Sequence, residues 1–128
     1  MTDIEEKLDA LSRWGADPNS AIKRMMGDEE LFLKLLYNFL SSRDWDRLAE
    51  LEEQGNFDEA FVISHRMKGS AADLSLGPLF NSLCIVTDDL RENVKESLHD
   101  DIRVLYLQRN SLRKAVLSDK SQGIQLLE

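Results

Sequence analysis

The residues best suited to chemistry in this chain lie together around His65, within the run Ser64–Ala72, SHRMKGSAA. If this run is helical, Lys68 lies one turn after His65, and Gly69 follows on the same surface patch. Glycine costs about 1 kcal/mol in a helix interior relative to alanine, so its presence beside an imidazole suggests that something large must approach here. We interpret the patch as a docking site for a phosphoryl group.

An exposed neutral imidazole can attack phosphorus through a ring nitrogen without a dedicated base. The ammonium of Lys68 can neutralise part of the charge of a phosphoryl group on His65, both in the adduct and in the transition state. The sequence contains no glycine-rich phosphate loop, no carboxylate cluster with a recognisable Mg²⁺ spacing and no kinase signature. This combination predicts a passive carrier rather than an enzyme, with no cofactor or metal held by the chain itself.

The elements that must position this patch are helices. Apolar residues recur at spacings of three and four along the chain, and no strand-like alternation of any length interrupts them. Capping and stop signals predict helices over residues 2–14, 17–27, 28–55 with an irregularity near 41–44, 56–74, 77–92 and 98–117. Four long helices with short connections favour an all-α fold, an antiparallel four-helix bundle with additional short N-terminal helices over one end.

We expect a single domain over residues 1–128. Its parts are N-terminal cap helices at about 2–27, a bundle core at about 28–117 and a weakly structured tail at 118–128. Three of the expected helices carry core stripes. The stripes are Phe32, Leu35, Leu36, Phe39 and Leu40; then Phe57, Ala60, Ser64, Met67, Ala71 and Leu74; and finally Leu98, Ile102, Leu105, Leu112 and Val116, with Arg109 as the one break. On the middle helix His65 should face solvent, Lys68 should flank the core boundary, and Gly69 should lie almost opposite the core.

The charge balance favours a protein partner. Sixteen basic against twenty-four acidic residues give a net charge of −8, which repels nucleic acid and anionic membranes. Cys84 has no second cysteine for a disulfide or a zinc site, which fits a reducing compartment. The sequence shows neither a signal peptide nor a membrane span, so we expect a cytoplasmic protein. The initiating Met and the apparently complete bundle favour a free-standing protein over a domain cut from a larger hybrid kinase.

With these motifs in place, the chain resembles a histidine-containing phosphotransfer (HPt) domain, the carrier family of multistep phosphorelays. The run Ser64–Ala72 is similar to the family's acceptor motif. The segment Gly27–Phe32, followed by Leu35, Leu36 and Phe39, is similar to the family's lead into the long helix before the acceptor.

The resemblance implies that His65 carries a phosphoryl group, that Lys68 assists and that Gly69 gives the partner access. It implies as partner a response-regulator receiver domain, or a hybrid sensor histidine kinase. The receiver would supply the phospho-accepting Asp and the Mg²⁺. Arg66, Ser70 and Ala72 should face the partner or support the acceptor helix, and Ser70 could equally pack on a neighbouring helix.

The sequence departs from the family's pattern at Ser75-Leu76, where Gly-Ala is usual, and at Thr87-Asp88, where Leu-Glu is commoner. We expect both departures to lie away from the acceptor patch and to affect packing and partner preference.

Two other functions are compatible with the sequence. The first is a docking module for a receiver or kinase that is never phosphorylated. The second is a dimeric phosphotransferase, which would need a large exposed apolar stripe. The sequence offers only scattered candidates for such a stripe, such as Val62 and Leu76, so we expect a monomer.

The remaining polar residues receive structural interpretations. We expect His99 to be solvated or to cap its helix, and His65 and His99 show no metal-ligand spacing. Asp88, Asp89 and Glu92 should form a solvated acidic face, and Cys84 a small buried hydrophobe.

Overall fold

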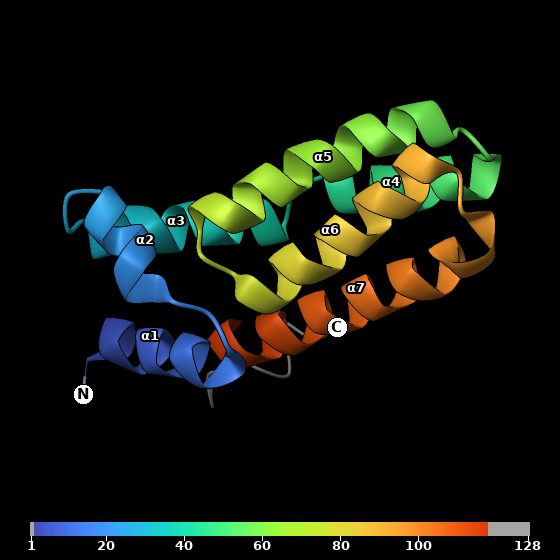
Figure 1. Ribbon diagram of the computed structural model, residues 1–128. Coiled ribbons are helices and arrows are strands. Elements are labelled where there is room, and N and C mark those ends of the chain that lie inside the picture. The colour runs from blue at the N-terminus through green and yellow to red at the C-terminus, as the bar shows by residue number, and fades with distance from the viewer. Residues whose placement is uncertain (1, 118–128) are drawn as a thin grey trace.

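A computed structural model describes residues 2–117 (Figure 1). Every regular element within that range is an α-helix, which confirms the all-α prediction. In chain order the helices are α1 (Asp3–Trp14), α2 (Pro18–Arg24), α3 (Glu29–Leu40), α4 (Asp44–Gln54), α5 (Phe57–Asp73), α6 (Gly77–Glu92) and α7 (Lys95–Leu117). None of these helices is long and apolar enough to cross a membrane. The tail predicted at 118–128 lies outside the described residues.

The two N-terminal helices begin where their capping residues predict. The Thr2 hydroxyl accepts a hydrogen bond from the amide of Glu5, and the Glu5 carboxylate accepts one from the amide of Thr2, which is a complete capping box. Helix α2 ends at Arg24, earlier than the predicted stop at Gly27. The chain leaves the helix early because Met26, with φ 60°, already adopts the left-handed conformation that we expected only at the glycine.

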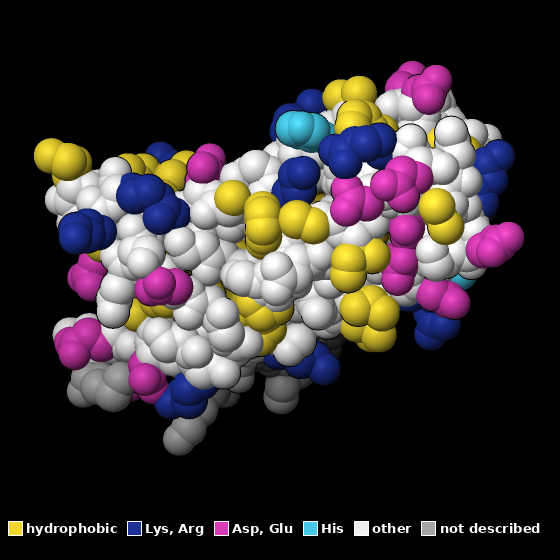
Figure 2. Space-filling view, viewed as in Figure 1, with side chains coloured by type: hydrophobic (Ala, Val, Ile, Leu, Met, Phe, Trp, Pro, Cys, Tyr) yellow, Lys and Arg dark blue, Asp and Glu magenta, His cyan; other side chains and the backbone are white. Residues whose placement is uncertain are grey.

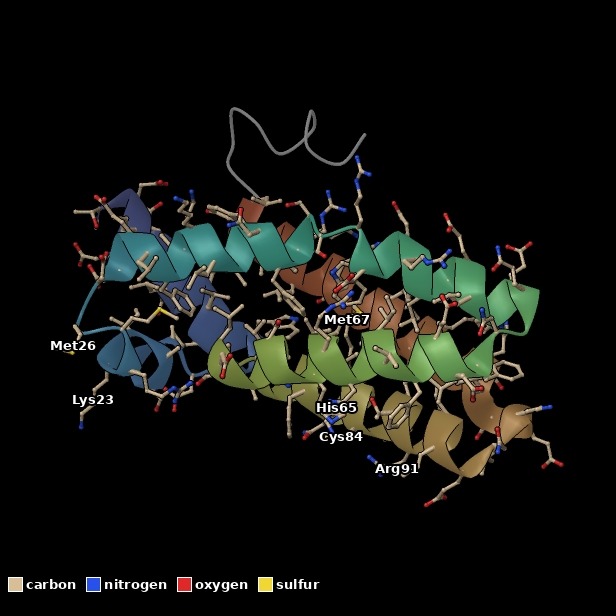
Figure 3. All side chains as sticks on the ribbon, turned by 90° about the horizontal axis from the view of Figure 1, so that it is seen from above. Lys23, Met26, His65, Met67, Cys84 and Arg91 are labelled. Carbon is tan, nitrogen blue, oxygen red and sulfur yellow. The ribbon has the colours of Figure 1, made fainter. Side chains whose placement is uncertain are left out.

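The irregularity predicted near 41–44 is a full break that separates α3 from α4. The buried indole of Trp45 donates a hydrogen bond of 2.9 Å to the carbonyl of Phe39, so the first turn of α4 is fastened to the last turn of α3. Figure 3 shows these two helices arranged roughly end to end. The prediction of Leu35 as a core residue is wrong: it is 38% exposed, while its neighbour Leu33 is buried at 7%.

The helices after this break pack side by side. Helix α5 contacts α4 and α6, α6 contacts α7, and α1 packs on α7. In Figure 1 the consecutive helices α5, α6 and α7 run in alternating directions, and α1 lies beside the C-terminal part of α7. A single hydrophobic core joins residues from all seven helices. It includes Leu76, whose predicted exposure is therefore wrong.

Arg109, the one break in the apolar stripe of α7, has a packing role. Its guanidinium lies over the rings of Trp45 and Tyr106, at 5.0 and 5.3 Å from the ring centroids. Burial raises the pKa of Tyr106 to about 12, and the Tyr106 hydroxyl donates to the carbonyl of Trp45. The polar position thus helps to hold α7 against the start of α4.

Candidate functional site

His65 lies on the exposed face of α5. The helix starts at Asn56, whose side chain accepts a hydrogen bond from the amide of Glu59, and it directs Ala60, Ser64, Met67 and Ala71 into the core. His65 follows a buried residue and therefore projects away from the core, as the helical period predicts. Figure 3 shows its imidazole on the outer side of α5, near Cys84 and Arg91 of α6, while Met67 points inward. The predicted acceptor is thus accessible to another protein.

Lys68 and Gly69 occupy the positions that the sequence predicts. Lys68 is half-buried and makes no hydrogen bond or ion pair with any residue in the described range 2–117. Gly69 is exposed, and a Cβ built on it meets nothing within 4 Å. Packing therefore does not require a glycine here. The patch combines an accessible imidazole, a neighbouring ammonium that has no hydrogen-bond or ion-pair partner among residues 2–117, and bare backbone.

Arg66 forms a contact that supports its helix. Its guanidinium forms two hydrogen bonds with the carboxylate of Asp44, at 2.7 and 3.1 Å. These bonds raise the pKa of Arg66, and they tie α5 to the first residue of α4. Of the two roles predicted for Arg66, the structure favours the supporting one.

Ser70 and Ala72 lie further along the same helix. The Ser70 hydroxyl donates a long hydrogen bond of 3.4 Å to the carbonyl of Arg66, one turn earlier, so this bond lies within α5. Ala72 is exposed and borders a shallow hollow of about 360 Å³, which lies between Gly15 and the facing ends of α5 and α6. Ala72 is therefore available to a partner that reaches beyond Gly69.

The departure at Ser75-Leu76 lies at the end of α5. Ser75 has φ 55°, a left-handed conformation that favours glycine. The guanidinium of Arg24 donates to the Ser75 hydroxyl at 2.9 Å and to the carbonyl of Asp73 at 2.8 Å. These bonds satisfy polar groups at the helix end and secure the turn despite the missing glycine.

The expectation that Thr87 lies away from the acceptor is wrong. Thr87 is fully buried, and its hydroxyl donates a 3.1 Å hydrogen bond to the hydroxyl of Ser64, the residue directly before His65. The Ser64 hydroxyl in turn donates to the carbonyl of Phe61. This chain of hydroxyls fastens α5 to α6 beside the acceptor. Sequence reasoning missed it because a contact between two helices leaves no periodic signal in either one.

Phe61 and Arg91 are two further neighbours that the sequence did not single out, and they are joined by Asp88, which we expected only as part of a solvated acidic face. The Phe61 ring meets the His65 imidazole edge to face, with centroids 6.0 Å apart. The Arg91 guanidinium lies 5.5 Å from the Phe61 centroid and forms an ion pair of 2.9 Å with Asp88. The one available signal was the position of Phe61, a full turn before His65. On the face in Figure 2, hydrophobic and Lys or Arg side chains border the His side chain over α5.

Asp89 does not belong to a solvated acidic face as predicted. One of its carboxylate oxygens is buried without a hydrogen-bond partner in the described structure. Burial and the neighbouring Asp101 carboxyl raise the pKa of Asp89 to about 6. Asp88 and Glu92 are exposed as expected.

The other polar candidates are structural. The imidazole of His99 lies 3.3 Å from both carboxylate oxygens of Glu52 on α4, so it contacts a second helix and does not cap its own. Cys84 is half-buried, more accessible than predicted. Within residues 2–117, no group of three or more His, Cys, Asp and Glu side chains is arranged to hold a metal ion.

Comparison with known proteins identified no relative of this chain. No protein-family model matches the chain, no curated protein is significantly similar to it in sequence, and no solved structure matches its fold significantly.

Proposed function

We propose that this protein is a histidine phosphocarrier of the HPt type, which accepts and donates a phosphoryl group between His65 and the Asp of receiver domains. The observation that carries the proposal is the exposed His65 on α5, beside the Lys68 ammonium, which no described residue pairs with, and a glycine that packing does not require. Of these three features, the glycine is the one that costs stability if α5 has only a structural role, about 1 kcal/mol relative to alanine. Together they match the needs of a phosphoryl acceptor inside another protein's active site.

The transfer step needs little from this chain. The lone pair of a neutral ring nitrogen of His65 attacks phosphorus, a P–N bond forms, and the P–O bond to the receiver's Asp breaks. The Asp leaves as a carboxylate with the bonding electron pair. The other ring nitrogen keeps its proton during transfer. Lys68 offsets charge on the phosphoryl oxygens, and the receiver supplies the Mg²⁺, so the carrier binds no cofactor and is no independent enzyme.

The same proposal also covers the arrangement of the helices, the partners and the location of the protein. We take α3 and α4 as one interrupted member of an antiparallel four-helix bundle whose other members are α5, α6 and α7. A rigid bundle suits this function because it presents the imidazole at a fixed position. The proposed partners are a receiver domain and a hybrid sensor histidine kinase, and the carrier acts as a cytoplasmic monomer.

Phosphorylation of the purified protein tests the proposal. The chain is mixed with receiver domains from its source that have been loaded with acetyl phosphate, and acid-labile, base-stable label is measured. We expect label on the wild type and on His99→Gln, the matched control at the other histidine, and none on His65→Gln. Lys68→Ala should be labelled more slowly because the phosphoryl charge is less well compensated.

The outcomes separate the alternatives. Label that persists on His65→Gln would refute the assignment of the acceptor. Binding of a receiver by an unlabelled wild type would instead favour the docking module.

A further inference from the structure

The outer edge between α6 and α7 carries apolar side chains that the core does not use. Ile85 on α6 is 51% exposed, and Val104 and Leu107 on α7 are 47% and 62% exposed. Single exposed apolar residues are common on protein surfaces, whereas a group of them bordered by polar residues is typical of an interaction site. Whether these three side chains form one group depends on the register between the two helices.

Two contacts between α6 and α7 define this register. The Ser82 hydroxyl donates a hydrogen bond of 2.7 Å to the side-chain oxygen of Gln108. Closer to the turn that joins the helices, the carboxyl of Asp101 lies against that of Asp89. As the residue number rises on α6, it falls on α7, so the two helices are antiparallel.

The apolar residues lie between these two contacts. On α6, Ile85 lies three residues after the first contact and four residues before the second. On α7, Val104 lies three residues after the second contact and four residues before the first. Residues at spacings of three and four share a helix face, so Ile85 and Val104 are neighbours across the edge, and Leu107 follows Val104 one turn later. We name these three residues the outer α6–α7 patch.

Acidic side chains border the outer α6–α7 patch. Glu92 and Asp100 are exposed, and Asp89 and Asp101 are partly buried where the two helices meet. None of these four carboxylates forms an ion pair with a residue in the range 2–117. In Figure 2, Asp and Glu side chains gather toward the α6–α7 turn, beside hydrophobic side chains over the middle of α7.

The basic residues nearest to this turn in sequence are engaged elsewhere. Arg91 forms an ion pair of 2.9 Å with Asp88, and the ammonium of Lys95 lies 5.2 Å from the ring centroid of Phe57. Neither of them neutralises the four carboxylates. The border of the patch therefore has an excess of negative charge, in a chain whose net charge is −8.

The two carboxyls between the helices lack a cation. One carboxylate oxygen of Asp89 is buried without a hydrogen-bond partner in the described part of the chain. Burial and the neighbouring Asp101 raise the pKa of Asp89 to about 6. An ammonium or a guanidinium placed beside this pair would donate the missing hydrogen bond and offset the repulsion between the carboxylates. The surface that complements the patch is thus apolar and positively charged.

We infer that the outer α6–α7 patch is a second docking surface, which binds a basic amphipathic helix of a partner protein. The edge between two packed helices accepts the apolar side of a third helix, whose anchors recur at spacings of three and four. Its Lys and Arg side chains pair with the carboxylates that border the patch. A second copy of this chain fits less well, because it would bring its own acidic residues against them, and nucleic acid or an anionic membrane is repelled.

This inference goes beyond the proposed function. In Figure 1, α6 lies between α7 and α5, the helix that carries His65. A helix bound at the outer α6–α7 patch therefore leaves the acceptor face open. The protein can stay attached to one partner through this patch while His65 exchanges a phosphoryl group with another.

The test measures binding of a fluorescent synthetic helix, made of leucine and lysine with one apolar face, to the full chain by fluorescence anisotropy. We expect the wild type to bind. Ile85→Ala and Val104→Ala should each weaken binding about three- to tenfold, because each removes apolar surface that the helix covers. Glu92→Gln combined with Asp100→Asn should weaken it by a similar factor. The same helix with glutamate in place of lysine should not bind.

Matched controls separate this patch from the rest of the surface. Val62→Ala removes a comparably exposed apolar side chain on α5, and Glu6→Gln combined with Glu30→Gln removes the same amount of charge at exposed positions on α1 and α3. Neither control should change the affinity, and thermal unfolding checks that every variant is folded.

Three outcomes overturn the inference. They are no binding by the wild type, equal affinities of the wild type and the patch variants, and a wild-type dimer that Ile85→Ala abolishes, which would assign the patch to a second copy of the chain. None of these measurements needs phosphorylation of His65. The proposed function is therefore tested separately and can fail or stand independently.

Discussion

Replacement of Gly69 by alanine should make the protein more stable and a poorer phosphocarrier. Gly69 lies in the interior of α5 with an exposed backbone, and an added Cβ meets nothing within 4 Å. The variant therefore gains the helix propensity of alanine without a packing penalty, about 0.8–1 kcal/mol. For a chain of this size that gain corresponds to a rise in Tm of roughly 3–5 °C.

Transfer should change in the opposite direction. If a receiver packs against the bare backbone at Gly69, a methyl group there forces the partner away from His65. Overpacking of a close contact costs about 1–3 kcal/mol, which lowers kcat/KM for transfer about five- to a hundredfold. A side-chain series at position 69, from alanine to leucine, should show progressively slower transfer while every member remains more stable than the wild type.

Two measurements decide the matter: thermal unfolding of the free protein, and the rate of phosphoryl transfer from a labelled receiver. Ala49→Gly is the matched control, since it reverses the substitution at an exposed position inside α4, a helix that carries none of the proposed site residues. It should lower stability and leave transfer nearly unchanged. Transfer by Gly69→Ala at the wild-type rate, together with a higher Tm, would refute the access role of the glycine.

Two further predictions concern buried polar groups near the site. The pKa of Asp89 is raised to about 6 from an unfolded value near 3.8, so its favourable contribution to stability is present below pH 3.8 and is lost as the pH rises through 6. Asp89→Asn should therefore be more stable than the wild type by about 1–2 kcal/mol at pH 7.5, and the two proteins should be equally stable near pH 3.5. Denaturant unfolding measures both free energies. Equal stabilities at both pH values would contradict this prediction. Ser64→Ala should cost about 1–3 kcal/mol because it leaves the buried Thr87 hydroxyl without its acceptor, and the added change Thr87→Val should recover most of that loss. Additive losses in the double variant would show that the two hydroxyls are not coupled.

Most helix starts could be predicted because their signals are local, whereas α7 begins at Lys95, three residues before the predicted start, and α2 ends before its predicted stop. Thr2, Asp28 and Asn56 each accept a hydrogen bond from an amide three residues later, and Gly55 adopts the left-handed conformation that ends α4. The core face of α3 was less certain from sequence, because Leu33 and Leu35 are both leucines that fit a broad apolar stripe. Only the placement of the other helices determines which of them is covered.

The candidate site likewise contains some residues that could be predicted from sequence and others that could not. His65, Lys68 and Gly69 were found from sequence because they share one helix and a fixed spacing. Thr87 and Arg91 were not, since their roles depend on how α6 packs beside α5. The mistaken solvated role for Asp89 has the same origin: its pKa is raised partly by Asp101, which belongs to the following helix.

Adjacent residues of the run Ser64–Ala72 project to different sides of α5 because of the helical period, so their roles differ. Ser64 and Arg66 secure α5 to α6 and α4 respectively, through one buried hydroxyl pair and one double hydrogen bond. His65 lies between them in sequence and projects from the exposed face. Substitutions at 64 and 66 should therefore change stability and function together, whereas those at 65 and 69 change function without loss of stability. This separation is what a carrier requires, because its reactive group must meet several partners while the helix beneath it stays fixed.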